Sequence, residues 1–161
     1  MSVTISLLPL ALAAASVFGG GTIAAAVRGG NDARTEESTA VTVRTRMKDR
    51  TLLEAALADI GATGIEAGDE VTATLGDARL TLTRGEDEIW QAHLTGELGD
   101  DELRRIGEDA ITRLDAAYAL RVQAAVVQRI RERAETTGFT LADEHRDGDT
   151  VTLTLSVGTG T

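Results

Sequence analysis

Residues 40–61 read AVTVRTRMKDRTLLEAALADIG, and the hydrophobic period changes inside this stretch. Its first half alternates apolar and polar side chains, which predicts a half-buried strand over residues 41–47. Asp49 is a good helix-capping residue, and after it the period becomes helical. The apolar stripe of this predicted helix consists of Leu52, Leu53, Ala56, Leu57 and Ile60, and Gly61 ends it. A strand followed by a short amphipathic helix therefore opens the domain.

The same two periods recur through the rest of the chain. Three short strands are predicted at 71–75, 80–82 and 90–94, and a long helix at about 99–134. Two last strands begin at Phe139 and Val151 and are joined by an Asp147-Gly148 turn. The predicted order is β-α-β-β-β-α-β-β, an α+β domain over residues 40–161 with a mainly antiparallel sheet and helices on one face. Its core is predicted to include Leu57, Trp90, Tyr118, Phe139 and Leu153.

The sequence also contains a weak internal repeat, called the internal echo below. Residues 52–75 (LLEAALADIGATGIEAGDEVTATL) and 130–155 (IRERAETTGFTLADEHRDGDTVTLTL) both run helix, glycine, strand-like stretch, turn and strand. A duplicated α+β unit would explain the echo.

The N-terminal segment has a different character, because no charged residue occurs over residues 2–27. A helix of this length would cross a hydrocarbon core, which needs roughly 20 residues. Three interpretations stay open: a membrane anchor, a helix packed in a protein assembly, and a cleaved signal peptide. A signal peptide carries positive charge before its apolar stretch, and Met1-Ser2-Val3-Thr4 has none.

The flanking residues bear on the first two interpretations. Arg28 and Arg34 follow the apolar stretch, which would leave the rest of the chain in the cytoplasm. Ala11, Ala15 and Gly19 are spaced four apart, as in closely packed helix pairs. We predict a hydrophobic N-terminal helix within residues 1–28, serving as membrane anchor or assembly helix, and a polar linker at 29–39. The expected location is the cytoplasmic face of the inner membrane or a cytoplasmic assembly.

Composition excludes several classes of function. The 161 residues contain no cysteine, so disulfides, cysteine-ligated metals and thiol catalysis are absent. The net charge of −10 repels phosphate backbones, so no nucleic-acid partner is expected. Only 2% of the residues are aromatic, which leaves the core to Ala, Val, Leu and Ile. The glycine runs at 19–21 and 29–30 lack the Lys and Ser/Thr of a phosphate-binding loop.

Two histidines are the candidates for chemistry. His145 lies among Asp143, Glu144, Asp147 and Asp149, oxygen ligands that a divalent metal could use, although the spacing matches no known loop and a solvated hairpin tip is the simpler interpretation. His93 is out of phase with its apolar neighbours and could be a general base, although an exposed or edge-strand histidine is the simpler interpretation. We therefore predict no catalytic, cofactor-binding or metal-binding residues.

The long predicted helix is rich in arginine. Its arginines are Arg104, Arg105, Arg113, Arg121, Arg129, Arg131 and Arg133. Acidic residues such as Glu102, Glu108 and Asp109 are interspersed with them, which predicts a solvent-facing helix with many ion pairs. A docking face for an acidic partner is the second interpretation.

Residues 40–157 resemble the Ycf-thirty-five-like family, small uncharacterised proteins of plastids, cyanobacteria and other bacteria. The matching motifs are Arg44-Thr45, Asp49, Ala56-Leu57, Ile60-Gly61, Tyr118-Ala119, Gly138-Phe139 and the Asp147-Gly148 turn before the last strand. That family is richer in aromatic residues and lacks the first forty residues found here. The resemblance implies no established activity, but it implies genetic association with AAA-type ATPases.

Two functional hypotheses follow. The first is a non-enzymatic accessory or scaffold module that is tethered by its N-terminal segment, binds a protein partner or itself, and works with an AAA-type ATPase. The alternative is a small enzyme or metal-binding protein that uses His93 or His145 with carboxylates. Convergence of both histidines with two carboxylates in one pocket would favour the alternative.

The acidic charge leads to one testable prediction. The purified protein should show no salt-sensitive binding to DNA or RNA, because a net charge of −10 offers no gain from counterion release. Fluorescence anisotropy with labelled oligonucleotides at low and high salt measures this. Sub-micromolar binding that weakens steeply with salt would contradict it.

Overall fold

The computed structural model describes residues 2–8 and 39–157. The chain divides into two compact units. Of the described residues, 39–118 form a five-stranded unit, while residues 2–8 and 119–157 form a three-stranded unit. Helix α3 (Asp100–Thr136) contributes its first half to the five-stranded unit and its second half to the three-stranded unit.

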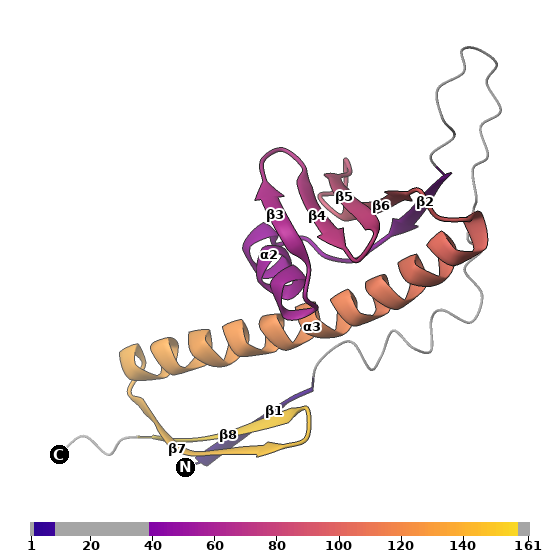
Figure 1. Cartoon of the computed structure of the whole chain (residues 1–161). Helices are drawn as coiled ribbons and strands as arrows, with labels where there is room; N and C mark the ends of the chain where they lie inside the picture. The colour runs from indigo at the N-terminus through magenta and orange to yellow at the C-terminus, as the bar shows by residue number, and fades with distance from the viewer. Residues whose placement is uncertain (1, 9–38, 158–161) are drawn as a thin grey trace. The chain divides into compact units, whose positions relative to one another are not determined.

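The five-stranded unit begins with β2 (Thr39–Arg44) and α2 (Arg50–Asp59). Four strands follow in the order β3 (Thr63–Ala67), β4 (Val71–Leu75), β5 (Ala78–Arg84) and β6 (Trp90–Gly96). The spatial order is β2-β6-β5-β4-β3, with every neighbouring pair antiparallel. Figure 1 shows α2 beside the β3 end of this sheet. Strand β6 therefore lies between two partners and is not an edge.

Local sequence signals set the ends of α2. The side chain of Asp49 accepts a hydrogen bond from the Leu52 N–H at 3.0 Å, which satisfies one of the free donors of the first turn. At the other end Gly61 has φ of +84°, a conformation that disfavours any residue with a Cβ. Both features confirm the predicted bounds of this helix.

One face of the five-stranded sheet forms the main core. Its buried side chains pack against α2 through Leu53, Ala56 and Leu57 and against the first half of α3 through Leu103, Ile111, Leu114 and Ala117. The sheet contributes Val71, Ala73, Ala78, Leu80, Leu82, Trp90, Ala92 and Leu94. The opposite face carries Thr42, Thr72, Thr81, Thr83 and His93, which are exposed or half-buried. The strict alternation of the strands thus gives one apolar and one hydroxyl-rich face.

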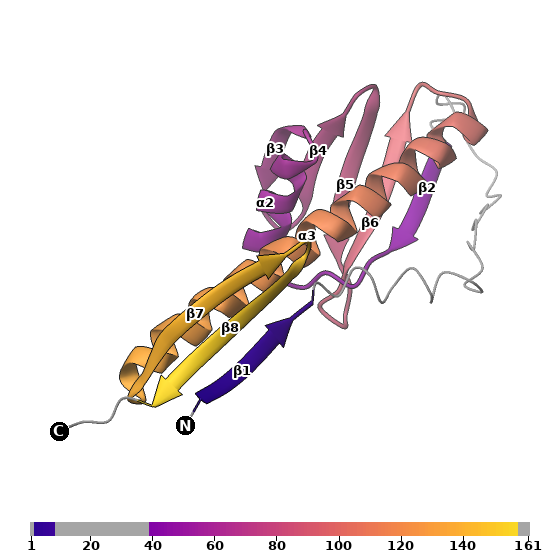
Figure 2. The same ribbon diagram turned by 90° about the horizontal axis from the view of Figure 1, so that it is seen from below.

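The three-stranded unit consists of β1 (Ser2–Leu7), β7 (Phe139–Asp147), β8 (Thr150–Val157) and the second half of α3. Strand β8 lies in the centre, antiparallel to both neighbours, and Figure 2 shows β1 and β7 on its two sides. Val127 of α3 packs with Val151 and Leu153 of β8 in a second, smaller core. Leu7, Ile130 and Leu141 surround it.

A buried glutamine completes this smaller unit. Gln123 of α3 is 6% exposed, and its Nε2 donates to the carbonyls of Leu7 at 2.8 Å and Asp149 at 2.6 Å. One side chain therefore joins the end of β1 to the β7–β8 turn. Both of its amide hydrogens are used, as the burial of a polar group requires.

The predicted α+β class with antiparallel strands is confirmed, but the arrangement differs in two respects. The strands form two sheets where one was predicted. Strand β3 is missing from the predicted element order, although the stretch was recognised as strand-like, because its sequence TGIEA contains a glycine and does not alternate cleanly. The predicted linker at 29–39 falls almost wholly outside the described residues, and residues 40–161 contribute to both units.

The predicted N-terminal helix is wrong over Ser2–Leu7, which is strand β1. Val3, Ile5 and Leu7 alternate with hydroxyl residues, and this period of two matches the apolar alternation of β8. The helical interpretation had rested on length and absence of charge. The remaining residues of that segment, 9–28, lie outside the described residues. Among the helices that the structure describes, none is long and apolar enough to span a membrane.

The predicted core is confirmed for Leu57, Trp90 and Leu153, which are buried, and is wrong in part for Tyr118 and Phe139, which are half-buried. We therefore expect Leu153→Ala to lower the free energy of unfolding by roughly 2–5 kcal/mol, since it leaves a cavity in a small core. Phe139→Ala should cost less because this residue is only half-buried.

Urea unfolding followed by circular dichroism measures both changes. Thr154→Ala, on the opposite face of β8, is the matched control and should stay within about 1 kcal/mol of the unsubstituted chain. A larger loss from Phe139→Ala than from Leu153→Ala would contradict the burial seen in the structure.

Candidate functional site

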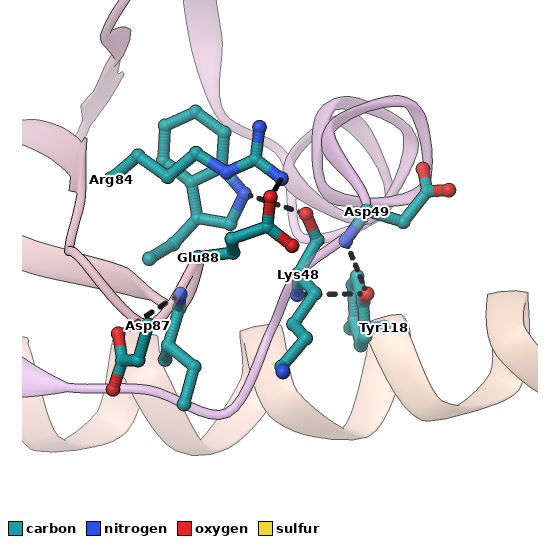
Figure 3. A network of polar contacts seen from close by, with 8 residues as sticks. Lys48, Asp49, Arg84, Asp87, Glu88 and Tyr118 are labelled. Carbon is teal, nitrogen blue, oxygen red and sulfur yellow. Dashed lines mark hydrogen bonds and ion pairs between the residues drawn. The ribbon is translucent and has the colours of Figure 1, made fainter.

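A polar network holds the segment between β2 and α2 against the rest of the five-stranded unit (Figure 3). The hydroxyl oxygen of Tyr118 accepts hydrogen bonds from the N–H groups of Lys48 at 3.2 Å and Asp49 at 3.0 Å. The indole Nε1 of Trp90 donates to the Lys48 carbonyl at 3.2 Å. Both aromatic side chains thus satisfy backbone groups of a loop, a structural role that also orients the capping residue Asp49.

The same network continues into the β5–β6 hairpin. The Arg84 guanidinium lies 5.9 Å from the centre of the Trp90 ring and 3.7 Å from the Glu88 carboxylate. Asp87 accepts a hydrogen bond from the Ile89 N–H at 3.2 Å. Glu88 has φ of +62°, an unusual conformation for a residue with a side chain. The contacts of this hairpin stabilise its turn, and Trp90 beneath them is buried, so they form no open site.

His93 lies in the middle of the hydroxyl-rich face of the five-stranded sheet. Its Nδ1 is 3.1 Å from the Thr42 hydroxyl on β2, and its Nε2 is 3.1 Å from the Thr83 hydroxyl on β5. The predicted edge-strand or exposed position is wrong, because the residue is half-buried on the interior strand β6. A general base needs a nitrogen free to reach a substrate proton, and here threonines occupy both.

The acidic cluster around His145 is divided between two faces of β7. Asp143 and His145 pair in register with Thr154 and Thr152 on the outer face. Glu144 pairs with Leu153 on the helix side, where it forms an ion pair with Arg131. Asp147, the register partner of Thr150, falls on the outer face as well, so the alternation of the strand removes only Glu144 from this group. Within residues 2–8 and 39–157, no three His, Asp or Glu side chains gather in a way that could hold a metal ion.

The two histidines also belong to different units, His93 to the five-stranded and His145 to the three-stranded unit. The arginine-rich helix α3 forms ion pairs, as expected: Arg104 with Asp101 at 3.6 Å and Arg113 with Asp109 at 3.6 Å. The glycine runs at 19–21 and 29–30 lie outside the described residues.

An open groove in the three-stranded unit has a different chemistry. It lies between the end of α3 and the sheet, is open to solvent and has a volume of about 410 Å³. Its lining residues are Arg129, Ile130, Arg133, Ala134, Thr137, Phe139 and Leu155. The surface that these residues present is mostly apolar. Val157, the register partner of Phe139, is 45% exposed and continues the apolar surface beyond the groove.

Two arginines flank this groove. Arg129 and Arg133 are four residues apart on α3 and exposed. Their guanidinium groups form no ion pair with the described residues, whereas Arg131 between them is paired with Glu144. The groove thus combines an apolar floor with two positive charges. Sequence reasoning placed these arginines on a solvated helix face and missed the groove, because Leu155 joins it only through the sheet.

Comparisons with known proteins add no relatives: no family model, no curated protein and no solved structure matches the chain. The resemblance to the Ycf-thirty-five-like family remains a prediction.

The Tyr118 contacts generate a prediction about stability. Tyr118→Phe keeps the ring but removes the oxygen that accepts two backbone hydrogen bonds, so we expect a loss of roughly 0.5–1.5 kcal/mol in the free energy of unfolding. Thr112→Ala on the same helix is the control, since its hydroxyl donates only to the exposed Glu108 carbonyl. Chemical denaturation of both variants measures the difference. Equal stability of the two variants would show that the network contributes nothing.

Proposed function

We propose that this chain is a non-enzymatic accessory or scaffold module that binds a protein partner. The observation that carries the proposal is the open apolar groove of the three-stranded unit with Arg129 and Arg133, which form no ion pair with any residue that the structure describes. Apolar surface left in water is costly unless something covers it at least part of the time. Arginine is also enriched where protein interfaces concentrate their binding energy.

Charge argues for an acidic, partly apolar partner. The chain as a whole carries a net charge of −10, so the positive charge at this groove is opposite in sign to the charge of the chain. A carboxylate of the partner could bind each guanidinium in a bidentate manner while aliphatic side chains enter the groove. Acidic groups near this chain are otherwise repelled, which would confine such a partner to the groove.

The N-terminal segment supplies the tether in this proposal. Because Ser2–Leu7 is a strand, the uncharged residues 9–27 that follow it are the part available for a membrane or for other proteins. Anchored there, the described units would work at the cytoplasmic face of the inner membrane or in a cytoplasmic assembly. The resemblance described above makes an AAA-type ATPase the first partner to test.

The alternative of a small enzyme or metal-binding protein has less support. Both nitrogens of His93 are adjacent to threonine hydroxyls, and the carboxylates around His145 are distributed over two faces of a strand. Within the described residues, no hydrogen bond or ion pair joins either histidine to a carboxylate, the contact that often orients a general base.

The groove gives a direct test by affinity purification of the full-length chain in mild detergent. We expect a stoichiometric protein partner with the unsubstituted chain and at least a tenfold lower recovery with Arg129→Glu/Arg133→Glu, because two charges at the groove are reversed. Arg79→Glu/Arg105→Glu is the matched control, since it makes the same change of net charge in the five-stranded unit. Equal recovery with all three chains would contradict the proposal, as would the absence of any stoichiometric partner.

A further inference from the structure

Strand β1 pairs with the three-stranded sheet along its whole length, but it is far in sequence from the other two strands. All six of its residues pair with β8 in one unbroken antiparallel register, from Ser2↔Ser156 to Leu7↔Val151. The other neighbour, β7, is connected to β8 by a tight turn at Gly148, whose φ is +55°. Strands β7 and β8 must therefore belong to the same molecule. No tight turn connects β1 to β8, so this constraint does not apply to β1.

The recognition of β1 by β8 is specific in two ways. Val3, Ile5 and Leu7 lie opposite Leu155, Leu153 and Val151, so a shift by one residue would turn the apolar set of β1 toward water. The buried Gln123 also donates to the Leu7 carbonyl, which marks the end of the strand. The edge of β8 can therefore bind an extended segment that has apolar residues at alternate positions.

Strand β1 is nevertheless only weakly packed against the rest of its unit. Val3 is 47% exposed, and only Ile5 and Leu7 are half-buried in the strand. Release of β1 would expose less apolar surface than release of β4, β5 or β6, because each of those strands carries fully buried side chains and β1 carries none. The covalent connection runs through residues 9–38, which at full extension reach no farther than about 100 Å, ample for β1 to meet the β8 edge of an adjacent copy.

We infer that β1 is an exchangeable strand and that the edge of β8 binds β1 of a second copy of this chain in the same register. The inference rests on the proposed function, since it names a second copy as one partner of the module, but it uses a surface that does not include Arg129 or Arg133. Intramolecular pairing has the advantage of an effective concentration in the millimolar range. Exchange therefore increases with protein concentration and with confinement of copies at one place.

Absence of cysteine from the chain makes a disulfide trap direct. Thr4 and Thr154 are register partners on the outer face of the sheet, at a spacing that a disulfide can bridge. A tagged full-length Thr4→Cys chain and an untagged Thr154→Cys chain are mixed in urea, refolded together in mild detergent at several concentrations and oxidised. We expect a disulfide-linked heterodimer whose yield rises with concentration. A tenfold excess of a peptide with the sequence of residues 2–8 should lower that yield at least threefold.

The controls separate strand exchange from random oxidation. Thr4→Cys mixed with Thr150→Cys should give at least tenfold less heterodimer, because these positions are four residues out of register. The double variant Thr4→Cys/Thr154→Cys in one chain should cross-link within the monomer. If it does so while the mixed copies yield no more heterodimer than the out-of-register pair, β1 does not exchange and the inference is wrong.

The groove variant distinguishes this inference from the proposed function. Arg129→Glu/Arg133→Glu in both copies should leave the heterodimer yield unchanged, because the groove that these arginines line includes no residue of β1. Gln123→Ala should lower the ability of the peptide to compete by roughly tenfold, since the Leu7 carbonyl loses its donor. Loss of the heterodimer in the groove variant would overturn the assignment of exchange to β8.

Discussion

Each of the two sheets must cover one apolar face, and helix α3 supplies cover for both. In the five-stranded unit, Leu103 and Leu114 of α3 are buried against the sheet together with α2. In the three-stranded unit, Val127 takes that role against Val151 and Leu153. A sheet with one apolar face is stable only when a second layer excludes water from that face. The burial along α3 therefore determines which residues of this chain can be functional, because the apolar faces are already used.

The faces turned away from α3 are rich in hydroxyl groups, and this composition limits the chemistry available there. His93 is held between two threonines on one sheet, and His145 lies beside Thr152 on the other. Threonine suits a strand exposed to water because its branched side chain fits the pleat and its hydroxyl remains solvated. Among residues 2–8 and 39–157, no three His, Asp or Glu side chains gather on these faces in a way that could hold a metal ion.

Protein association is consistent with the surfaces that remain. The groove between α3 and β8 and the β1 edge both belong to the three-stranded unit, whose core is the smaller of the two. A small core tolerates rearrangement at its edges more readily than a large one, because less apolar surface must be exposed. Such a unit is well suited to engage partners while the five-stranded unit stays folded.

The internal echo of the sequence has a structural counterpart. Helix α2 is followed by Gly61 at φ of +84° and the antiparallel pair β3 and β4, and α3 is followed by Gly138 at φ of +79° and the antiparallel pair β7 and β8. In each case a third strand pairs with the second strand of the hairpin, β5 in one unit and β1 in the other. The difference is that β5 follows directly in sequence, whereas β1 comes from the N-terminus.

The local elements follow from short stretches of sequence. The Asp49 cap, Gly61 and the Asp147-Gly148 turn each act through neighbours in the chain, so their effect could be predicted without knowing the fold. The alternation over residues 41–47 correctly predicted a strand, but β2 spans Thr39–Arg44 and ends before the last three of these residues. Only the tertiary structure decided which strands pair, because the register of Ser2–Leu7 with β8 depends on residues at the opposite end of the chain. The hydroxyl partners of His93 and the groove beside Leu155 were decided in the same way, since both join side chains that only sheet pairing brings together.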